Sequence, residues 1–483
     1  MYNRVAIAYG DGIGPEIMES VLAVFRAVEL NLSIDIVEVG EKLYSRGFDS
    51  GIAPSAWETV LNNKILLKAP ITTPFGGGYK SLNVTFRKGL GLYANVRPLR
   101  SFSPFVKSYS DKADVVVIRE NEEDLYAGIE YRLSNNTYQS LKLVSRLGCE
   151  KIIKYAFDYA IANNRRKVTC CVKDNIMKMT DGLFSSVFDE IAKSYPSIET
   201  NKIIVDIGTA RMAKYPEDFD VIVTMNLYGD IISDVIAEIL GSVGTCGSAN
   251  IGDDFAMFEA IHGSAPDIAG KNIANPSGLL NAAIMMLNHI NLSEKALLIE
   301  NAFLKTIEDG VHTADMYNKE ISNKKVTTSE FTDAIIARLG SKPEVLKTQE
   351  VPTKKVVTSG YKIIDQVKAI KRDLVGTDIY LNYKYDVVND LANLLQELGD
   401  GLNLQLQMIS SRGLQIWPVN VNPNEKSELS RCRFVSNQVD KMVTQKEILA
   451  LLTCCSDQDL DIAKIENLYL YDGELGFSLS QGQ

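Results

Sequence analysis

The chain has 483 residues, enough for two or three domains, and 46% of them are hydrophobic and 23% charged. These averages are those of soluble globular proteins and exclude collagen-like, coiled-coil and wholly disordered classes. The formal net charge of −10 argues against nucleic acid as a partner, because the molecule as a whole repels a phosphate polymer.

The beginning of the chain and its apolar runs predict no secretory or membrane segment. The first ten residues are typical of a β-strand that runs into a glycine turn, without the apolar core of a signal peptide. Apolar runs such as residues 284–287 are much shorter than the ~20 residues of a membrane span. Seven cysteines without a C-x-x-C pair indicate free buried thiols. We therefore expect a cytoplasmic protein without a membrane partner.

Residues 1–340 alternate short β-branched runs with amphipathic stretches, which predicts an α/β fold. Several of the runs are apolar throughout, as in a parallel sheet that is covered on both faces. The expected strands are residues 5–9, 34–39, 65–69, 115–119, 168–172, 202–206 and 221–225, and the clearest helices are 15–29, 150–163, 181–195 and 230–240.

Two features interrupt or follow this alternation. Residues 128–132 and 139–144 are typical of a β-hairpin around a Ser-Asn-Asn turn. Residues 341–357 carry two prolines and scattered charges, which indicates a linker. A further α+β unit follows, with expected strands at 378–383, 402–409, 414–419 and 432–435, helices at 387–398 and 444–453, and a last strand pair around Asp472.

Three glycines lie between the first expected strand and a helix that has Pro15 in its first turn, at positions 10, 12 and 14. Their spacing is G-x-G-x-G, whereas a dinucleotide fingerprint is G-x-G-x-x-G with an acidic residue about 20 positions on. A standard Rossmann site is therefore not expected. The turn either approaches a ligand or only closes a tight strand-to-helix connection.

Three arginines, Arg87, Arg97 and Arg119, follow a glycine-rich run that leads into Ser81 and Asn83. A guanidinium matches a carboxylate with two parallel hydrogen bonds, so three of them favour a ligand with several carboxylates. The alternative is that each arginine pairs with an acid of the protein itself.

Asp230 and Asp234 are expected one turn apart on the same helix, where like charges repel by about 0.2 to 0.5 kcal/mol. A hard divalent cation such as Mg²⁺ or Mn²⁺ would offset this repulsion. Alternatively, Asp230 caps the helix and Asp234 is a solvated surface acid.

Three further residues suit acid–base work or ligand binding, although each could be structural. Lys173 directly follows an expected strand, and strand ends of α/β proteins commonly carry functional groups. Tyr126 lies in the segment before the expected hairpin. His262 is one of only three histidines and belongs to a loop rich in glycine and proline.

Together these segments resemble the isocitrate dehydrogenases of the β-decarboxylating dehydrogenase family, which also includes the isopropylmalate dehydrogenases. The matching segments occur in the family's order over roughly residues 1–340: Ser81 to Arg87, Arg119 to Asn121, Tyr126 to Gly128, Lys173 to Asn175, Asn226 to Asp234 and His262 to Pro266. The last unit is similar to the C-terminal extension of a long-chain branch.

The resemblance implies a large domain (1–98 and 241–340), a small domain (99–240) and a clasp hairpin (125–146) that pairs across a homodimer. Residues 341–357 would link these to the extension, residues 358–483. We expect the extension to shape the dimer or a higher oligomer.

The resemblance also implies oxidative decarboxylation of isocitrate to 2-oxoglutarate and CO₂, a step of the tricarboxylic acid cycle. Lys173 would act as general base and Tyr126 as the proton donor to C3 of the substrate. Asp206 and Lys173 would reach in from the partner subunit, so that each site needs two chains. The implied substrate residues are Ser81, Asn83, Arg87, Arg97 and Arg119, and the implied ligands of Mg²⁺ or Mn²⁺ are Asp206, Asp230 and Asp234.

The choice of nucleotide depends on two residues of the histidine loop. NADP-using relatives have Lys-Tyr where this chain has Asp267 and Ile268. Because an acid repels a 2′-phosphate but accepts a hydrogen bond from a 2′-hydroxyl, we expect NAD. Lys271 and Lys319 lie near in sequence and leave NADP as the alternative. The implied cofactor contacts are Thr72, Glu259, His262, Gly263, Asp267, Ile268 and Asn275.

Three alternative functions remain open. Homoisocitrate dehydrogenase acts on a tricarboxylate that is one methylene longer. 3-Isopropylmalate dehydrogenase has an apolar pocket in place of the segment with Ser81 and Asn83, which argues against it here. A noncatalytic regulatory subunit would have lost site residues, whereas this chain has all of them.

Overall fold

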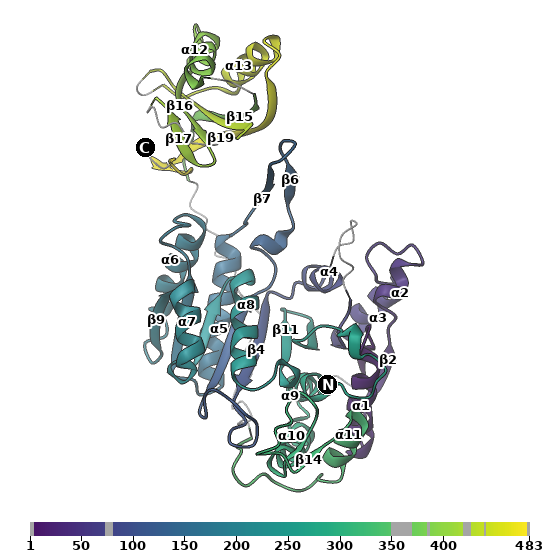
Figure 1. Cartoon of the computed structure of the whole chain (residues 1–483). Coiled ribbons are helices and arrows are strands. Elements are labelled where there is room, and N and C mark those ends of the chain that lie inside the picture. The colour runs from purple at the N-terminus through teal and green to yellow at the C-terminus, as the bar shows by residue number, and fades with distance from the viewer. Residues whose placement is uncertain are drawn as a thin grey trace. The chain divides into compact units, whose positions relative to one another are not determined.

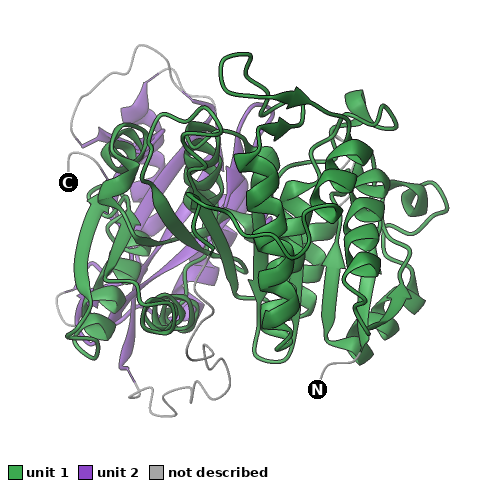
Figure 2. Ribbon diagram, turned by 90° about the horizontal axis from the view of Figure 1, so that it is seen from below, with its two compact units in different colours: residues 1–127, 142–361 green, residues 128–141, 362–483 purple. Residues whose placement is uncertain are grey.

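The computed structural model describes residues 4–72, 81–348, 370–383, 387–418, 427–438 and 441–480. The chain forms two compact units (Figure 2). The larger unit comprises residues 1–127 and 142–361, and the smaller unit comprises residues 128–141 and 362–483. The chain therefore leaves the larger unit after residue 127, returns at residue 142, and leaves it again after residue 361.

The described part of the larger unit is built on a ten-stranded sheet with the order β2-β1-β3-β12-β11-β4-β5-β10-β8-β9 (Figure 1). Two groups of parallel strands, β2-β1-β3-β12 and β5-β10-β8-β9, are joined through the antiparallel pairs that β11 and β4 form. The strands are β1 (Arg4–Ala8), β2 (Ser33–Ile36), β3 (Ile65–Lys68), β4 (Ala94–Arg100), β5 (Asp114–Glu120), β8 (Lys167–Val172), β9 (Glu199–Ile204), β10 (Val221–Thr224), β11 (Gly247–Ile251) and β12 (Ala256–Ala260).

The expected α/β class is confirmed, but the expectation of a parallel sheet is wrong at the sheet's centre. The central strands β4, β11 and β12 were not predicted, because buried polar residues such as Asn95, Arg97 and Glu259 interrupt their apolar pattern. The outer strands lie close to their predicted positions.

Helices cover both faces of the sheet. Alternate residues of β1 enter different cores: Val5 and Ile7 join the large core, whereas Ala6 and Ala8 join a core on the opposite face. The helices of the larger unit are α1 (Gly14–Ala27), α2 (Glu41–Tyr44), α3 (Pro54–Asn63), α4 (Leu82–Gly89), α5 (Arg146–Ala162), α6 (Thr180–Ala192), α7 (Val205–Lys214), α8 (Asn226–Ile239), α9 (Ser277–His289), α10 (Ser293–Glu308) and α11 (Thr328–Ile336). A small two-stranded sheet, β13 (Val311–His312) with β14 (Lys324–Lys325), completes the unit.

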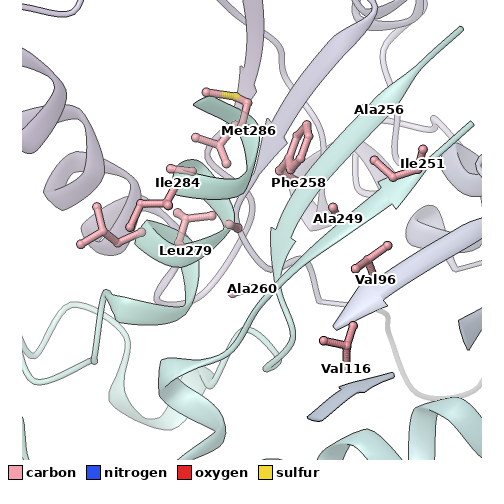
Figure 3. Close-up of a cluster of buried hydrophobic side chains, with 14 of the residues drawn as sticks. Val96, Val116, Ala249, Ile251, Ala256, Phe258, Ala260, Leu279, Ile284 and Met286 are labelled. Carbon is pink, nitrogen blue, oxygen red and sulfur yellow. The ribbon is translucent and has the colours of Figure 1, made fainter. Parts of the chain in front are cut away.

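Figure 3 shows how α9 packs on the centre of the sheet. Leu279, Ile284 and Met286 of α9 belong to the same buried cluster as Phe258 of β12 and Ala249 of β11. This packing fixes β11 and β12, the two strands that bring polar side chains into the sheet's centre.

The smaller unit contains a six-stranded antiparallel sheet with the order β17-β16-β18-β15-β19-β20. Its elements are β15 (Arg372–Asn382), α12 (Val388–Gly399), β16 (Gln405–Ser411), β17 (Leu414–Trp417), β18 (Leu429–Val435), α13 (Gln445–Asp457), β19 (Asp461–Tyr471) and β20 (Glu474–Leu475). A capping box starts α13: the Thr444 hydroxyl accepts from the Glu447 amide at 3.2 Å, and the Glu447 carboxylate accepts from the Thr444 amide at 2.7 Å. The expected α+β architecture of this unit is present.

The expected hairpin is also present, as β6 (Glu130–Arg132) paired with β7 (Tyr138–Ser140), and it belongs to the smaller unit. The predicted large and small domains both lie in the larger unit, so the boundary between them stays a prediction. Residues 349–357 of the predicted linker lie outside the described residues. All seven cysteines are free. Among the described helices, none has both the length and the apolar surface that crossing a bilayer demands.

Candidate active site

Arg97, Arg119 and Asp230 form a charged cluster where β4, β5 and α8 meet. One Asp230 oxygen lies 3.1 Å from an Arg97 nitrogen and 2.5 Å from an Arg119 nitrogen. Arg119 also donates to the side-chain oxygen of Asn226 at 2.7 Å. The close approach requires a glycine, because a Cβ on Gly229 would lie 2.6 Å from Cγ of Arg119. The stem of the Arg119 side chain thus packs directly against the backbone of α8 at Gly229.

The cluster is electrostatically unusual. Burial and then the neighbouring cations Arg97 and Arg87 lower the pKa of Arg119, to about 9. Burial alone would raise the pKa of Asp230, but Arg119 and Arg97 outweigh burial and hold it below its ordinary value. Asp230 therefore stays ionised. Its single negative charge faces two guanidiniums, those of Arg97 and Arg119, so the cluster has a net positive charge.

Asp234 lies one turn after Asp230 on α8, as predicted. Its oxygen is 3.5 Å from Arg97, and its side chain is 60% exposed. Burial and the nearby Asp230 raise the pKa of Asp234, although Arg97 opposes them. The alternative in which Asp230 caps the helix is wrong, because α8 begins at Asn226 rather than at residue 230.

Tyr126 lies in the single turn η1 (Leu125–Ala127), just before the hairpin. Its hydroxyl donates to the second oxygen of Asp230 at 2.5 Å, and the guanidinium of Arg119 lies 4.9 Å from the centre of its ring. Burial raises the pKa of Tyr126, and the hydrogen bond to Asp230 adds to this effect. The phenol is therefore protonated at neutral pH and able to donate a proton.

A cavity of about 100 Å³ joins predicted substrate residues to predicted cofactor residues. Asn83, Arg87 and Arg97 line it together with Glu259, His262 and Gly263. Three of these side chains have a buried polar atom without a hydrogen-bond partner among the described residues: Asn83 Oδ1, Arg87 Nε and His262 Nε2. Because buried polar groups are normally paired, this cavity has the character of a binding site for a polar ligand.

Glu259 is held between two cations in the wall of this cavity. One oxygen lies 2.8 Å from Nζ of Lys68, and the other lies 3.0 Å from a nitrogen of Arg87. Burial alone would raise the pKa of Glu259, but Lys68 and Arg87 more than offset burial and lower it strongly. Lys68 was missed from the sequence. The sequence signal that could have revealed it is a lysine within an otherwise apolar strand, since all residues of β3 are buried.

A network of amides behind the cluster was also missed. The side-chain oxygen of Asn250 accepts from Asn95 at 2.7 Å and from Asn121 at 3.0 Å, and its amide group donates to Glu259 at 2.8 Å. Asn95 in turn accepts from Nε of Arg97 at 2.7 Å. These bonds connect Glu259 to Arg97 through buried side chains, and they fix the orientation of the Glu259 carboxylate and of the Arg97 guanidinium.

The segment with Ser81 and Asn83 begins α4. Ser81 is the residue before the first helical residue, and its side chain makes no capping bond. Its carbonyl accepts from the Thr85 hydroxyl at 3.1 Å. Residues 76–80, the glycine-rich run before it, lie outside the described residues.

Lys173 and Asp206 form an ion pair with each other. The hydrogen bond from Lys173 lowers the pKa of Asp206, whose side chain is 67% exposed. Residue 206 lies in the first turn of α7 and not, as expected, at the end of a strand. Among the described residues of one chain, no three acidic, histidine or cysteine side chains are grouped as a metal site. One chain therefore does not assemble the predicted trio of aspartates.

The glycine turn after β1 is filled by protein backbone. A Cβ at Gly10 would lie 2.1 Å from the carbonyl oxygen of Pro70, and one at Gly12 would lie 2.0 Å from that of Ser264. Of the two interpretations, the structure therefore supports the tight connection. The turn also positions Thr72, whose amide donates to Asp11 at 3.0 Å.

The remaining predicted cofactor residues surround the histidine loop. The Thr72 hydroxyl lies 2.7 Å from that of Ser264. Nδ1 of His262 lies 3.0 Å from the carbonyl oxygen of Gly263, and burial lowers the pKa of the imidazole. Asp267 and Ile268 form the turn η4 (Pro266–Ile268), and Asn275 donates to Asp315 at 2.9 Å.

Comparison with known proteins places this site in a family. The model of the isocitrate/isopropylmalate dehydrogenase family matches residues 4–335, and that of the bacterial isocitrate dehydrogenase C-terminal domain matches residues 372–483. A Rickettsia bellii protein named isocitrate dehydrogenase [NADP] is 56% identical over 100% of this chain and 99% of its own. A crystal structure of a Thermus thermophilus protein is 39% identical, with a TM-score of 0.91 over 99% of this chain and 96% of that one.

The expected preference for NAD is wrong. Five Rickettsia relatives, 54% to 56% identical over the full chain, are all named isocitrate dehydrogenase [NADP]. The prediction gave too much weight to Asp267. Its side chain is exposed, and water and salt weaken the repulsion between a solvated carboxylate and a phosphate.

The sequence match and the structural match both extend along the whole chain, including the second unit. The chain belongs to the isocitrate/isopropylmalate dehydrogenase family, and its smaller unit matches the bacterial isocitrate dehydrogenase C-terminal domain.

Proposed function

We propose that the protein is an isocitrate dehydrogenase that converts isocitrate to 2-oxoglutarate and CO₂ with NADP. The observation that carries this proposal is the cavity in which Asn83, Arg87 and Arg97 face Glu259 and His262. It places groups that suit a polyanion beside groups that suit a nucleotide. The names of the full-length relatives support the same reaction and the same nucleotide.

The arginines determine the class of substrate. Arg87 and Arg97 are buried cavity residues, and Asp230 links Arg119 to Arg97. A ligand with three carboxylates would offset the mutual repulsion of these guanidiniums and pair with their forks. Ser81 and Asn83 would donate hydrogen bonds to it, which an isopropyl group is unable to accept.

The residues present fit a divalent cation. Asp230 stays ionised, and Asp234 presents a second carboxylate on the same helix, so the donor set consists of hard oxygens. Asp206 of a second chain would complete the set. When bound, Mg²⁺ or Mn²⁺ would supply Lewis acidity for the oxidation and the decarboxylation.

The roles proposed for Lys173 and Tyr126 are proton transfers. The Tyr126 hydroxyl donates a hydrogen bond to Asp230 in this structure, and in the reaction it would deliver its proton to C3 of the substrate. Lys173 would remove the proton of the substrate hydroxyl. In one chain Lys173 is paired with Asp206, a partner that it would exchange for substrate in a dimer.

Exposed apolar side chains support a homodimer with shared sites. Ile207 follows Asp206 and is 54% exposed, and Ile231 follows Asp230 and is 51% exposed. Ile176, three residues after Lys173, is 69% exposed. Large apolar side chains beside the proposed catalytic groups are typical of a surface that a second copy covers. The clasp hairpin would take part in the same interface, with a higher oligomer as a further possibility.

NADP would bind at the histidine loop. His262 has a buried nitrogen without a partner among the described residues, and Lys271 lies four positions after Asp267. The proposal includes a step of the tricarboxylic acid cycle in the cytoplasm, where seven free thiols would stay reduced.

Steady-state assays with purified protein test the proposal. Isocitrate, homoisocitrate and 3-isopropylmalate are each offered with NADP and with NAD, in the presence of Mg²⁺. We expect the highest kcat/KM for isocitrate with NADP. Turnover of another substrate at a higher kcat/KM would refute the assignment, and inactivity with all three would favour the noncatalytic alternative.

A further inference from the structure

The hairpin of β6 and β7 is held by the C-terminal part of the same chain. One oxygen of Glu428 accepts from the Ser134 hydroxyl at 2.6 Å and from the Asn136 amide at 3.0 Å. Asn382 donates to the Leu133 carbonyl at 2.8 Å, and Lys464 donates to the Gln139 side chain at 2.9 Å. The hairpin is therefore fixed from three different places in the smaller unit.

The hairpin needs such support, because each of its strands has only three residues. Two-stranded ribbons of this size are at best marginally stable in water. Within the hairpin, Ser134 accepts from the amides of Asn136 and Thr137, at 3.2 and 3.0 Å. Glu428 binds this same turn, so its carboxylate completes the hydrogen bonding of the hairpin's tip.

The base of the hairpin carries Tyr126. The amide of Asp124 donates to the Leu143 carbonyl at 2.8 Å, which closes the base, and the Asp124 carboxylate accepts from the Leu227 amide of α8 at 2.8 Å. Tyr126 thus lies between an anchor on α8 and the start of the hairpin at Gly128, where φ is +67°. If the hairpin were mobile, its motion would displace Tyr126, because only the short turn η1 separates the two.

The geometry points to a positioning role for the C-terminal domain: Glu428, with Asn382 and Lys464, holds the hairpin so that Tyr126 keeps its hydroxyl on Asp230. The inference rests on the proposed function in one respect, the use of Tyr126 as proton donor. It assigns a catalytic consequence to residues that are far from the site in sequence. None of the three is a catalytic residue, because each acts through the hairpin.

The experiment compares E428A with E428Q in the full-length protein. The glutamine retains an oxygen that accepts from Ser134 and Asn136, whereas the alanine does not. We expect faster hydrogen exchange of residues 125–141 in E428A, a kcat roughly tenfold lower, and a KM for isocitrate within about twofold of the wild type. E428Q should keep most of the wild-type kcat. E397A, which removes an exposed glutamate of α12, is the matched control.

A second background separates positioning from a general loss of structure. In Y126F the tyrosine hydroxyl is absent, so adding E428A should cause no further fall in kcat. An equal fall in kcat when E428A is added to the wild type and to Y126F would overturn the inference. Unchanged hydrogen exchange of residues 125–127 in both E428A and N382A would also overturn it. Hydrogen exchange is measured without substrate and therefore does not depend on activity. An inactive wild type would refute the proposed function, whereas the hydrogen-exchange data would still decide this inference.

Discussion

Tyr126 and Asp230 share a hydrogen bond of 2.5 Å, which joins the turn before the hairpin to one of the two metal ligands proposed on α8. The same carboxylate pairs with Arg97 and Arg119 through its other oxygen. One aspartate thus orients the proposed proton donor and two of the proposed substrate arginines. Replacing Tyr126 by phenylalanine removes this bond and leaves the ion pairs of Asp230 in place.

Removing the hydroxyl of Tyr126 should impair proton delivery without disturbing the fold. The Y126F ring can still pack beneath the guanidinium of Arg119. We expect kcat for reductive turnover of NADP to fall by about 10²- to 10⁴-fold, the usual contribution of a general acid. The melting temperature should stay within a few degrees of the wild type. An unchanged kcat would show that another group supplies the proton.

Glu259 should make stability depend on pH. Its pKa is lowered in the folded protein by Lys68 and Arg87, so its stabilising effect is present above the ordinary glutamate pKa and is lost as the pH falls through and below it. We expect E259Q to lower the free energy of unfolding at pH 7 by about 3 to 5 kcal/mol, because it leaves buried cations unpaired.

Urea unfolding of wild type and E259Q between pH 7 and pH 3 measures this effect. The difference between the two stabilities should start to shrink near pH 4, where the carboxyl group of the unfolded chain becomes protonated, and should continue to shrink towards pH 3, because the pKa of Glu259 in the folded protein is lower still. A difference that stays constant over this range would mean that the ionisation of Glu259 does not stabilise the fold.

Mixed dimers test whether the site is shared. K173M and D230N should each be inactive, because each removes one proposed catalytic or metal-binding group from every site. After co-expression, a heterodimer would contain one site with both substitutions and one site with neither. If the chains mix at random, activity should recover to about a quarter of wild type. Full inactivity of isolated heterodimers would place Lys173 and Asp230 of one chain in the same site.

The proposed metal should be required and should bind through Asp234. EDTA should abolish turnover, and Mg²⁺ or Mn²⁺ should restore it. D234N should raise the Mg²⁺ concentration for half-maximal activity by on the order of 10- to 100-fold, as removal of even a supporting residue does. E238Q changes an exposed acid one turn later on α8 and is the control. Equal Mg²⁺ requirements in the two variants would exclude Asp234 as a ligand.

Strands such as β1, β3 and β10 were predictable because they are mostly apolar, whereas the central strands β4, β11 and β12 were not. On β12, the polar residue Glu259 lines the cavity, and on β11 Asn250 donates a hydrogen bond to Glu259. A pattern based on burial of apolar surface fails where buried polar groups pair with one another. Lys68 was missed for the same reason, since its partner Glu259 is 191 positions away in the sequence.

The candidate site was more predictable from its resemblance to a family than from its chemistry alone. Arginine fork geometry suggested a polyacid, but it left open whether Arg97 and Arg119 pair with acids of the protein. Both do pair with Asp230 in this structure. The nucleotide prediction failed because it treated the solvated carboxylate of Asp267 as a fixed charge.

The contacts of the hairpin also set an order of events during synthesis. Leu133, Ser134 and Gln139 leave the ribosome long before their respective partners in the finished protein, which are Asn382, Glu428 and Lys464. At about 5 to 20 residues per second, the nascent hairpin waits roughly 15 to 65 seconds for Lys464. The larger unit can thus collapse first, and the hairpin is secured only when translation is almost complete.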